Sequence, residues 1–206
     1  MFTRKGSQRV MNSKTYIFAS DIHGSISATQ KLADIFEDTA ADKLILLGDL
    51  LNPSFVMAHN EDFQPNLVAD ILNTYRNSII AVKGNGDNGH TQSKLSFPCL
   101  SPFHLLPFQH NKRLFISHGH LYKEEFPPQL SPKDIIVSGH THFPSIKFAD
   151  QNLIINPGSI AHPRQGFKAS YGILKDNQFK IVNTDGSLFA QHDFNQPIDG
   201  THFDWS

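Results

Sequence analysis

The sequence predicts an α/β fold, with parallel strands in the first half of the chain and a second half that is richer in β-sheet. Short apolar runs bounded by turn residues alternate with segments whose apolar residues recur at helical spacing. This alternation is typical of βαβ units and a parallel sheet. A chain of 206 residues is long enough for one domain with a sizeable core. No repeat, low-complexity tract or linker divides it.

Three apolar runs in the first half are the predicted parallel strands, at residues 16–19, 44–47 and 79–82. After the first strand, Ser25 or Ser27 can cap a helix. The apolar face of this helix consists of Ala28, Leu32, Ile35 and Phe36. A second helical stripe precedes the third strand and consists of Leu67, Val68, Ile71, Leu72 and Tyr75.

Short apolar runs in the second half of the chain predict further strands at residues 114–116, 135–137 and 153–155. From Ser170 onward we expect antiparallel strands, with turns at Asp176-Asn177 and Asp185-Gly186. A connector rich in Phe and Pro spans residues 97–108 and is expected to pack on the sheets or on a second copy of the chain. The second alternative leaves a homo-oligomer open. We expect one domain over residues 15–195, a flexible N-terminal extension over 1–14 and a C-terminal tail over 196–206.

Composition excludes several classes of protein. The chain has 18 Lys and Arg residues and 19 Asp and Glu residues, so its net charge is −1. It has no excess of positive charge that would indicate nucleic acid as a primary partner. No run approaches the roughly 20 apolar residues of a membrane span, and no secretory signal follows the N-terminus. The single cysteine, Cys99, cannot form an internal disulfide, which indicates a reducing compartment, the cytoplasm. The 12 histidines need an explanation.

Polar clusters follow the apolar runs, at the edge where open α/β sheets bind ligands. In chain order these clusters contain Asp21, His23, Asp49, Asn85, His118, His120, His140 and His142. Carboxylates, amide oxygens and imidazoles are ligands of divalent transition metals. A Gly-Asp turn or a lone histidine is usually structural, but the whole set in this order is hard to obtain by chance.

The spacing of the paired residues also suits a metal site. Residues two apart on an extended segment point the same way, so Asp21 with His23, or His140 with His142, could supply two ligands from one stretch. Two metals can be held if one carboxylate bridges them. Phosphoryl displacement is the reaction that such a paired site suits.

These motifs resemble the calcineurin-like metallophosphoesterase superfamily. Residues 20–25 (SDIHGS), 48–52 (GDLLN), 118–121 (HGHL) and 156–159 (NPGS) are similar to its YfcE-type phosphodiesterases, and the resemblance spans about residues 16–194. It implies a four-layer α/β/β/α sandwich of two mixed β-sheets flanked by helices. It also implies a metal-dependent hydrolase of small-molecule phosphodiesters, in which a hydroxide between two divalent metals attacks phosphorus in line.

The resemblance assigns the ligands by position. The first metal would be held by Asp21, His23, Asp49 and His142. The second would be held by Asp49, Asn85, His118 and His140, with Asp49 bridging the two. Such families usually take Mn²⁺, and sometimes iron, nickel or zinc, and the ligand types do not choose among these metals. Substrate contacts are expected from Asn52, Asn85, His120 and Arg164, with Asp49, Asn85 and His120 in the catalytic centre.

The chain departs from the family pattern at Gly86, where many relatives have a histidine that protonates the leaving group and others have cysteine. Either the leaving group departs unassisted or another residue such as His120 takes this role. Asp87 is open to two interpretations, a partner that orients a ligand imidazole or a turn aspartate. The motif of protein serine/threonine phosphatases is missing after Asp49, which disfavours a phosphoprotein substrate. We treat as exposed the remaining histidines, His59, His90, His104, His110, His162, His192 and His202.

An alternative function is a protein-interaction scaffold on the same fold, as in one retromer subunit with a partly altered metal site. Fold alone does not decide between the two functions. Here every ligand position expected of the family carries a competent side chain. The sequence therefore favours the enzyme.

Overall fold

The computed structural model describes residues 14–53, 60–108, 112–122, 130–131, 134–149 and 152–195. The helices are α1 (Ile26–Asp38), α2 (Pro65–Thr74) and α3 (Gly89–Lys94). The strands are β1 (Tyr16–Ala19), β2 (Lys43–Leu46), β3 (Ile79–Ala81), β4 (Phe103–Pro107), β5 (Arg113–Ser117), β6 (Ile135–Val137), β7 (Pro144–Ala149), β8 (Asn152–Pro157), β9 (Ser170–Lys175), β10 (Gln178–Asn183) and β11 (Leu188–Asp193). The expected extension and tail lie outside the described residues, apart from Lys14.

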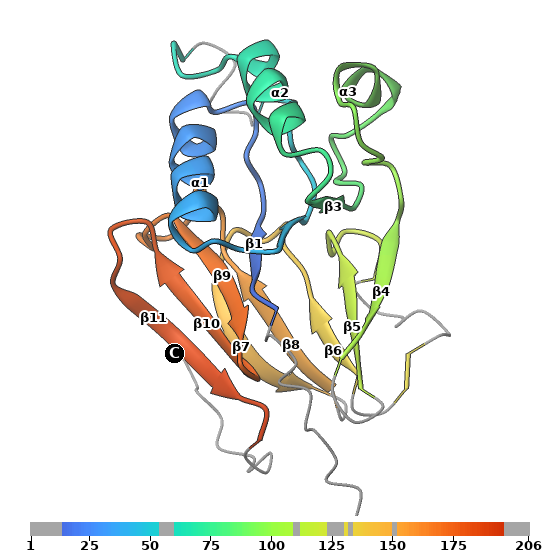
Figure 1. The fold of residues 1–206 in the computed structure, drawn as a ribbon, viewed down its shortest axis with the longest axis vertical. Helices are drawn as coiled ribbons and strands as arrows, with labels where there is room; N and C mark the ends of the chain where they lie inside the picture. The colour runs from blue at the N-terminus through green and yellow to red at the C-terminus, as the bar shows by residue number, and fades with distance from the viewer. Residues whose placement is uncertain are drawn as a thin grey trace, which may run out of the picture.

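The strands form two mixed β-sheets (Figure 1). The six-stranded sheet has the order β11-β10-β9-β1-β2-β3, in which β1, β2 and β3 are parallel and β9 to β11 antiparallel. The five-stranded sheet has the order β4-β5-β6-β8-β7, in which β5, β6 and β8 are parallel and the edge strands antiparallel. The predicted mixed sheets with flanking helices are therefore confirmed, and so are the antiparallel strands after Ser170.

Two apolar layers hold these elements together. Side chains alternate between the two faces of a strand, so β1 directs Phe18 toward the other sheet and Ile17 toward the helices. Phe18 packs between the sheets with Phe179 of β10, their ring centroids 5.2 Å apart. Ile17 belongs to a second buried cluster with Leu32 of α1 and Leu72 of α2. The alternation in one short strand thus supplies both cores.

The helices begin where the sequence provides a start signal. Ser25, not Ser27, caps α1, because its hydroxyl accepts a hydrogen bond from the Ala28 N–H. Helix α2 begins at Pro65 and buries Val68 and Leu72. The prediction for Leu67 is wrong: it is 49% exposed, because α2 buries only a narrow stripe beside α1.

Three elements were not predicted. The Phe- and Pro-rich connector contains edge strand β4, where Pro107 is tolerated because an edge strand leaves backbone groups unpaired. Strand β7 forms the other edge of the same sheet, and α3 follows the capping residue Asn88. No helix in the described part of the chain covers the outer face of the five-stranded sheet, and none there is long and apolar enough to cross a membrane.

Candidate metal centre

The predicted metal ligands converge at one edge of the two sheets. Asp21 and His23 follow β1, Asp49 follows β2, Asn85 follows β3, His118 follows β5, and His140 and His142 follow β6. The carboxyl ends of these parallel strands meet at this edge, which is where α/β folds place their ligands. Residues 119 positions apart in the sequence are thereby brought into contact, as shown by the His140 N–H, which donates to Asp21 Oδ2 at 3.1 Å.

One group of side chains surrounds Asp21 Oδ1. His142 Nε2 lies 3.3 Å from this oxygen and His23 Nε2 lies 3.8 Å from it. Asp49 Oδ2 lies 3.8 Å from the same nitrogen of His23. The ligand atoms of Asp21, His23 and His142 are close enough to bind one cation together, and those of Asp21, Asp49 and His118 are close enough to bind another.

A second group surrounds His118 Nε2. Asp49 Oδ2 lies 3.7 Å from this nitrogen, Asn85 Oδ1 3.0 Å and His140 Nδ1 3.2 Å. Asp49 Oδ2 therefore faces both groups, which is the position of a bridging carboxylate. The arrangement has the ligand types and the shared carboxylate of a two-metal hydrolytic site.

The histidine rings are held in the tautomer that a metal requires. The Nδ1 atoms of His23, His118 and His142 each lie against a backbone carbonyl oxygen, that of Asn52 at 3.1 Å, Leu47 at 2.7 Å and His162 at 2.6 Å, respectively. A carbonyl only accepts, so each Nδ1 carries the hydrogen. Each Nε2 then directs its lone pair into the cluster, as in metal sites where the outer partner fixes the ring.

The carboxylates of Asp21 and Asp49 each accept a hydrogen bond from the protein at one of their two oxygens. Ser20 Oγ donates to Asp21 Oδ2 at 2.6 Å, whereas Asp21 Oδ1 and His23 Nε2 are buried with no hydrogen-bond partner in the described residues. The Gly86 N–H donates to Asp49 Oδ1 at 2.7 Å and leaves Oδ2 for the cluster. Buried polar atoms without partners are rare and costly, so their convergence here fits a bound cation.

The electrostatics of Asp21 and His142 are coupled. Burial raises the pKa of Asp21, but the His142 and His118 rings beside it outweigh this effect, so the pKa lies below the ordinary value. Burial lowers the pKa of His142, but the Asp21 carboxylate, 3.3 Å from its Nε2, outweighs this effect and raises the pKa above the ordinary value. Asp21 therefore stays ionised and attracts either a proton or a cation to this group.

The sequence predicted that the paired ligands lie on extended segments, and this prediction is wrong. Asp21, His23, Asp49, His140 and His142 all have positive φ, between 50° and 68°. Asp and His are among the residues that enter the left-handed region least unfavourably. The turns are tied together, because the His23 N–H donates to the Asp49 carbonyl at 2.9 Å. Tight left-handed turns, rather than strand alternation, aim these ligand pairs at one point.

Asp87 does not orient an imidazole, so that interpretation is wrong. Its buried carboxylate accepts the backbone N–H groups of Asp49 at 2.7 Å, Gly84 at 2.9 Å and Leu50 at 3.1 Å. Burial raises the pKa of Asp87 above its ordinary value. Asp87 is thus a turn aspartate that fixes the backbone of the bridging residue Asp49.

The residues of the 156–159 motif support the ligand loops. Asn156 Nδ2 donates to the Gly139 carbonyl at 2.8 Å, next to His140. Ser159 Oγ donates to the Asp21 carbonyl at 3.0 Å. The motif therefore holds two ligand-bearing loops from behind.

The expected substrate contacts lie around an open cavity of about 420 Å³ at the cluster. Asn52, Asn85 and Arg164 line it, together with Phe143, which sequence reasoning missed. Phe143 directly follows His142, a position that signals proximity to the site. His120 lies beside His118 and His140, with ring centroids 5.3 and 6.1 Å apart. Burial and the neighbouring His118 lower the pKa of His120.

The histidines treated as exposed divide into three groups. His90 is exposed, and His59, His110 and His202 lie outside the described residues. His104, His162 and His192 are half-buried, which corrects the prediction. His162 lies beside His23, with ring centroids 5.7 Å apart. Burial and the neighbouring His23 and His142 lower the pKa of His162 to about 4, so its ring is neutral at physiological pH.

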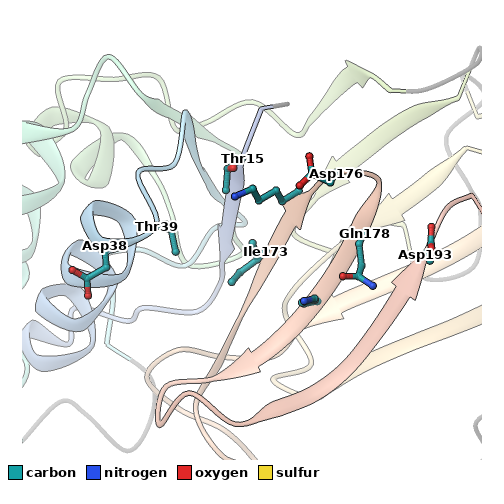
Figure 2. Close-up of a pocket in the computed structure, with 9 residues that line it drawn as sticks. Thr15, Asp38, Thr39, Ile173, Asp176, Gln178 and Asp193 are labelled. Carbon is teal, nitrogen blue, oxygen red and sulfur yellow. The ribbon is translucent and has the colours of Figure 1, made fainter. Parts of the chain in front are cut away.

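A larger cavity, of about 550 Å³, lies at the opposite end of β1 (Figure 2). Thr15, Asp38 and Thr39 form one wall, and β9, β10 and the turn between them form the other. Its lining contains both lysines and aspartates, so charges of both signs face the cavity. This cavity is separate from the metal centre.

Comparison with known families defines the class of protein. A family model described as the calcineurin-like phosphoesterase superfamily domain matches residues 15–178. The chain therefore belongs to the calcineurin-like phosphoesterase superfamily, whose members use divalent metals. The resemblance inferred from the motifs is confirmed.

Individual relatives narrow this class. The chain is 39% identical over 176 residues to Phosphodiesterase YfcE of Escherichia coli K12, which covers 85% of this chain and 95% of that protein. The solved structure of E. coli YfcE, a phosphoesterase, matches with a TM-score of 0.82 and 37% identity over 88% of this chain and 100% of that one. Zinc-bound Vps29 of Entamoeba histolytica matches with a TM-score of 0.57 and 20% identity, covering 88% and 99% of the two chains, and shows the fold alone.

Proposed function

We propose that this chain is a phosphodiesterase that uses two divalent metal ions, foremost Mn²⁺. The observation that carries the proposal is that Asp21, His23 and His142 converge on one point and Asp21, Asp49 and His118 on a second. Asp49 Oδ2 lies within 3.8 Å of both His23 and His118. One ion is assigned to Asp21, His23, Asp49 and His142. The other is assigned to Asp49, Asn85, His118 and His140. Iron, nickel or zinc would satisfy the same ligands.

The bound ions would supply an activated water nucleophile and offset the charge that develops on the phosphoryl oxygens. The residues of the chain do the rest. Arg164, on the cavity wall, pairs with a phosphate oxygen through its guanidinium group. The amide groups of Asn52 and Asn85 contact the phosphoryl group from the same wall. Water attacks phosphorus in line, the bond to the leaving oxygen breaks, and a monoester and an alcohol are released.

The leaving oxygen must take up a proton, and Gly86 has no side chain to donate one. His120 is the nearest candidate, since its ring lies against His118 and its Nδ1 has no hydrogen-bond partner among the described residues. His120 would then protonate the leaving oxygen in place of the side chain that Gly86 lacks. Because burial and the neighbouring His118 lower the pKa of His120, little of it is protonated at neutral pH, and substrates whose leaving groups are already acidic are favoured.

The proposed substrates are small diesters. The name of the E. coli relative, a phosphodiesterase, supports this choice, and the protein phosphatase motif is missing from the sequence. A cytoplasmic location fits the single buried cysteine, Cys99. The homo-oligomer and the single domain over 15–195 stay predictions.

The decisive experiment is turnover after metal removal. The chelated protein should be inactive on bis-p-nitrophenyl phosphate and regain activity with Mn²⁺, and with Fe²⁺, Ni²⁺ or Zn²⁺ to differing extents. The mono-p-nitrophenyl ester should be a much poorer substrate. The scaffold alternative predicts no turnover with any metal, even when elemental analysis finds two ions per chain.

A further inference from the structure

A small apolar cavity adjoins the metal centre on the side of α2 and α3. It has a volume of about 320 Å³, and Leu51, Pro53, Phe63 and Pro65 supply its apolar lining. This volume is at the lower end of the range for small-molecule sites, which are typically apolar with few polar groups. The cavity is therefore large enough for one ring-bearing substituent rather than a whole extended ligand.

Two residues connect this cavity to the catalytic cavity. Asn52 and Pro53 line both. Gly86 also lines the apolar cavity, and its N–H donates to Asp49, the shared carboxylate of the metal centre. A group held between the metals and Arg164 can therefore extend directly past Asn52 into the apolar cavity.

The junction between the two cavities is occupied by Asn52, because Gly86 has no side chain. A Cβ atom at position 86 would lie 1.8 Å from Asn52 Nδ2, so the Asn52 amide occupies the space that a side chain at 86 would take. The side-chain oxygen of Asn52 is buried and accepts no hydrogen bond from the described residues. The junction is thus formed by a small side chain whose oxygen has no hydrogen-bond partner among the described residues.

Phe63, the aromatic wall, is fixed relative to the metal ligands. Its ring lies against Gly24, where a Cβ would come within 2.5 Å of the ring and where φ is +72°, so only glycine suits the position. The Gln64 N–H donates to the Gly24 carbonyl at 2.8 Å, and Phe63 forms a β-bridge with Ser25. Because Gly24 follows His23, the same turn that carries a metal ligand positions the aromatic wall.

The charge on the lining of the cavity favours a ligand with acceptor groups. Lys94 and His90 line it, and no carboxylate is among its described lining residues. Lys94 Nζ donates to Asn66 Oδ1 at 2.5 Å and retains two further N–H donors. An aromatic ring that carries a carboxylate or another acceptor matches both the apolar lining and the Lys94 ammonium group.

We propose that this cavity is a specificity subsite that receives one ester arm of the phosphodiester and selects an arm with a planar aromatic or heterocyclic ring. The inference rests on the proposed phosphodiesterase activity and names the class of substrate. Phe63 provides the ring contact, and Lys94 favours an acceptor on the ring. Alkyl diesters leave the cavity unfilled and bind more weakly.

The test compares diesters that share one leaving group. The Mn²⁺-loaded full chain is assayed with phenyl, 4-carboxyphenyl and methyl p-nitrophenyl phosphate, each rate divided by its uncatalysed hydrolysis rate. The wild type should prefer the phenyl to the methyl diester by about tenfold or more in kcat/KM, the range that one apolar contact gives. The 4-carboxyphenyl diester should be preferred further.

Single-residue variants test which side chains produce the preference for the aromatic diesters. Phe63→Leu should lose most of the phenyl preference and change the methyl rate by less than about twofold. Lys94→Gln should remove only the preference for the carboxylate. The matched control is Phe108→Leu, which alters a half-buried phenylalanine beyond β4 that packs on Phe194 and should leave every ratio unchanged. Phe63→Tyr, which keeps the ring, is the second variant should Phe63→Leu not fold, and it should keep the preference.

The outcomes separate this inference from the proposed function. Absence of turnover on all three diesters with two metals bound overturns the phosphodiesterase assignment and the subsite with it. Turnover with equal phenyl and methyl ratios, or a preference that survives in Phe63→Leu, overturns the subsite alone. In both of these last cases the phosphodiesterase assignment stands.

Discussion

Replacing Gly86 by histidine tests why this chain differs from its superfamily. The resemblance to the superfamily implies a proton-donating histidine at this position, and general-acid help contributes typically 10²–10⁴-fold. The φ angle of Gly86 lies outside the positive region, so the backbone itself accepts a side chain. The obstacle is Asn52, whose Nδ2 atom would lie 1.8 Å from the new Cβ.

The size of the obstacle follows from these distances. Ordinary contact begins at 3.4 Å, so the Asn52 amide must retreat by about 1.6 Å. Overpacking of this kind costs about 1–3 kcal/mol. In a domain of this size that lowers Tm by about 2–4 °C per kcal/mol. A backbone shift at Gly86 would also disturb its hydrogen bond to Asp49, so Gly86→His alone should lose part of its metal affinity.

The double variant Asn52→Ala with Gly86→His removes the clash. Its rate on alkyl diesters should exceed that of Asn52→Ala by about 10- to 100-fold, part of the general-acid range. Rates on nitrophenyl diesters, whose leaving groups need no proton, should change little. Each protein is assayed at saturating Mn²⁺, and log kcat is plotted against leaving-group pKa for all four members of the cycle.

The slope of this plot decides the outcome. A shallower slope in the double variant supports a missing proton donor as the rate limit for poor leaving groups. An unchanged slope with two metals bound would refute this reasoning, and His120 or a metal-bound water would become the better candidate for the donor. His120→Ala is the companion variant, since loss of that donor should make the slope steeper in the wild-type background.

Three further predictions concern the metal centre and its surroundings. Asp49→Ala should lose both metals, as measured by elemental analysis, and its activity should fall by orders of magnitude. Its far-ultraviolet circular dichroism should stay unchanged, because Asp49 lies in a turn outside the core strands. Two tightly bound ions in an active variant would contradict the shared position of Asp49. Activity and metal content should fall together on acidification. Asp21 raises the pKa of His142, so the proton competes with the metal below that raised pKa and the competition disappears above it; a flat pH–rate profile at limiting metal would argue against this. Cys99 should resist alkylation in the native protein and react on unfolding, because burial and the nearby Asp87 raise its pKa to about 12; rapid labelling of native protein would count against the buried position.

Much of the fold could be predicted because its signals are local. Buried strands such as residues 135–137 are short apolar runs with turn residues on both sides, and the structure reproduces that strand without change. The hairpin at Asp176-Asn177 was predictable because both residues favour the left-handed conformation that its turn requires, and both have positive φ. The edge strands β4 and β7 escaped, because a half-exposed strand with prolines lacks a continuous apolar run.

The identity of the clustered residues was predictable, but the manner of their clustering was not. Residue types and order indicated Asp21, Asp49 and the histidine pairs, since each follows a predicted strand. The role of Asp87 was not readable, because it depends on three backbone N–H groups from two separate turns. The proximity of His162 to His23 has the same origin, a contact between loops that no local pattern encodes.

The backbone conformation of the ligand turns argues for a metal centre over a scaffold. Each non-glycine residue in the left-handed region costs roughly 1–2 kcal/mol, and five of the seven proposed ligands are in that region. Such conformations persist where the surrounding structure enforces them, and they cluster at functional sites. Here the enforcement is visible in the carboxylate of Asp87, the amide of Asn156 and the hydroxyl of Ser159, each buried and each spent on a ligand-bearing loop. A surface that only docks a partner needs none of these buried bonds, whereas ligands that must reach a cation from five turns at once need all of them.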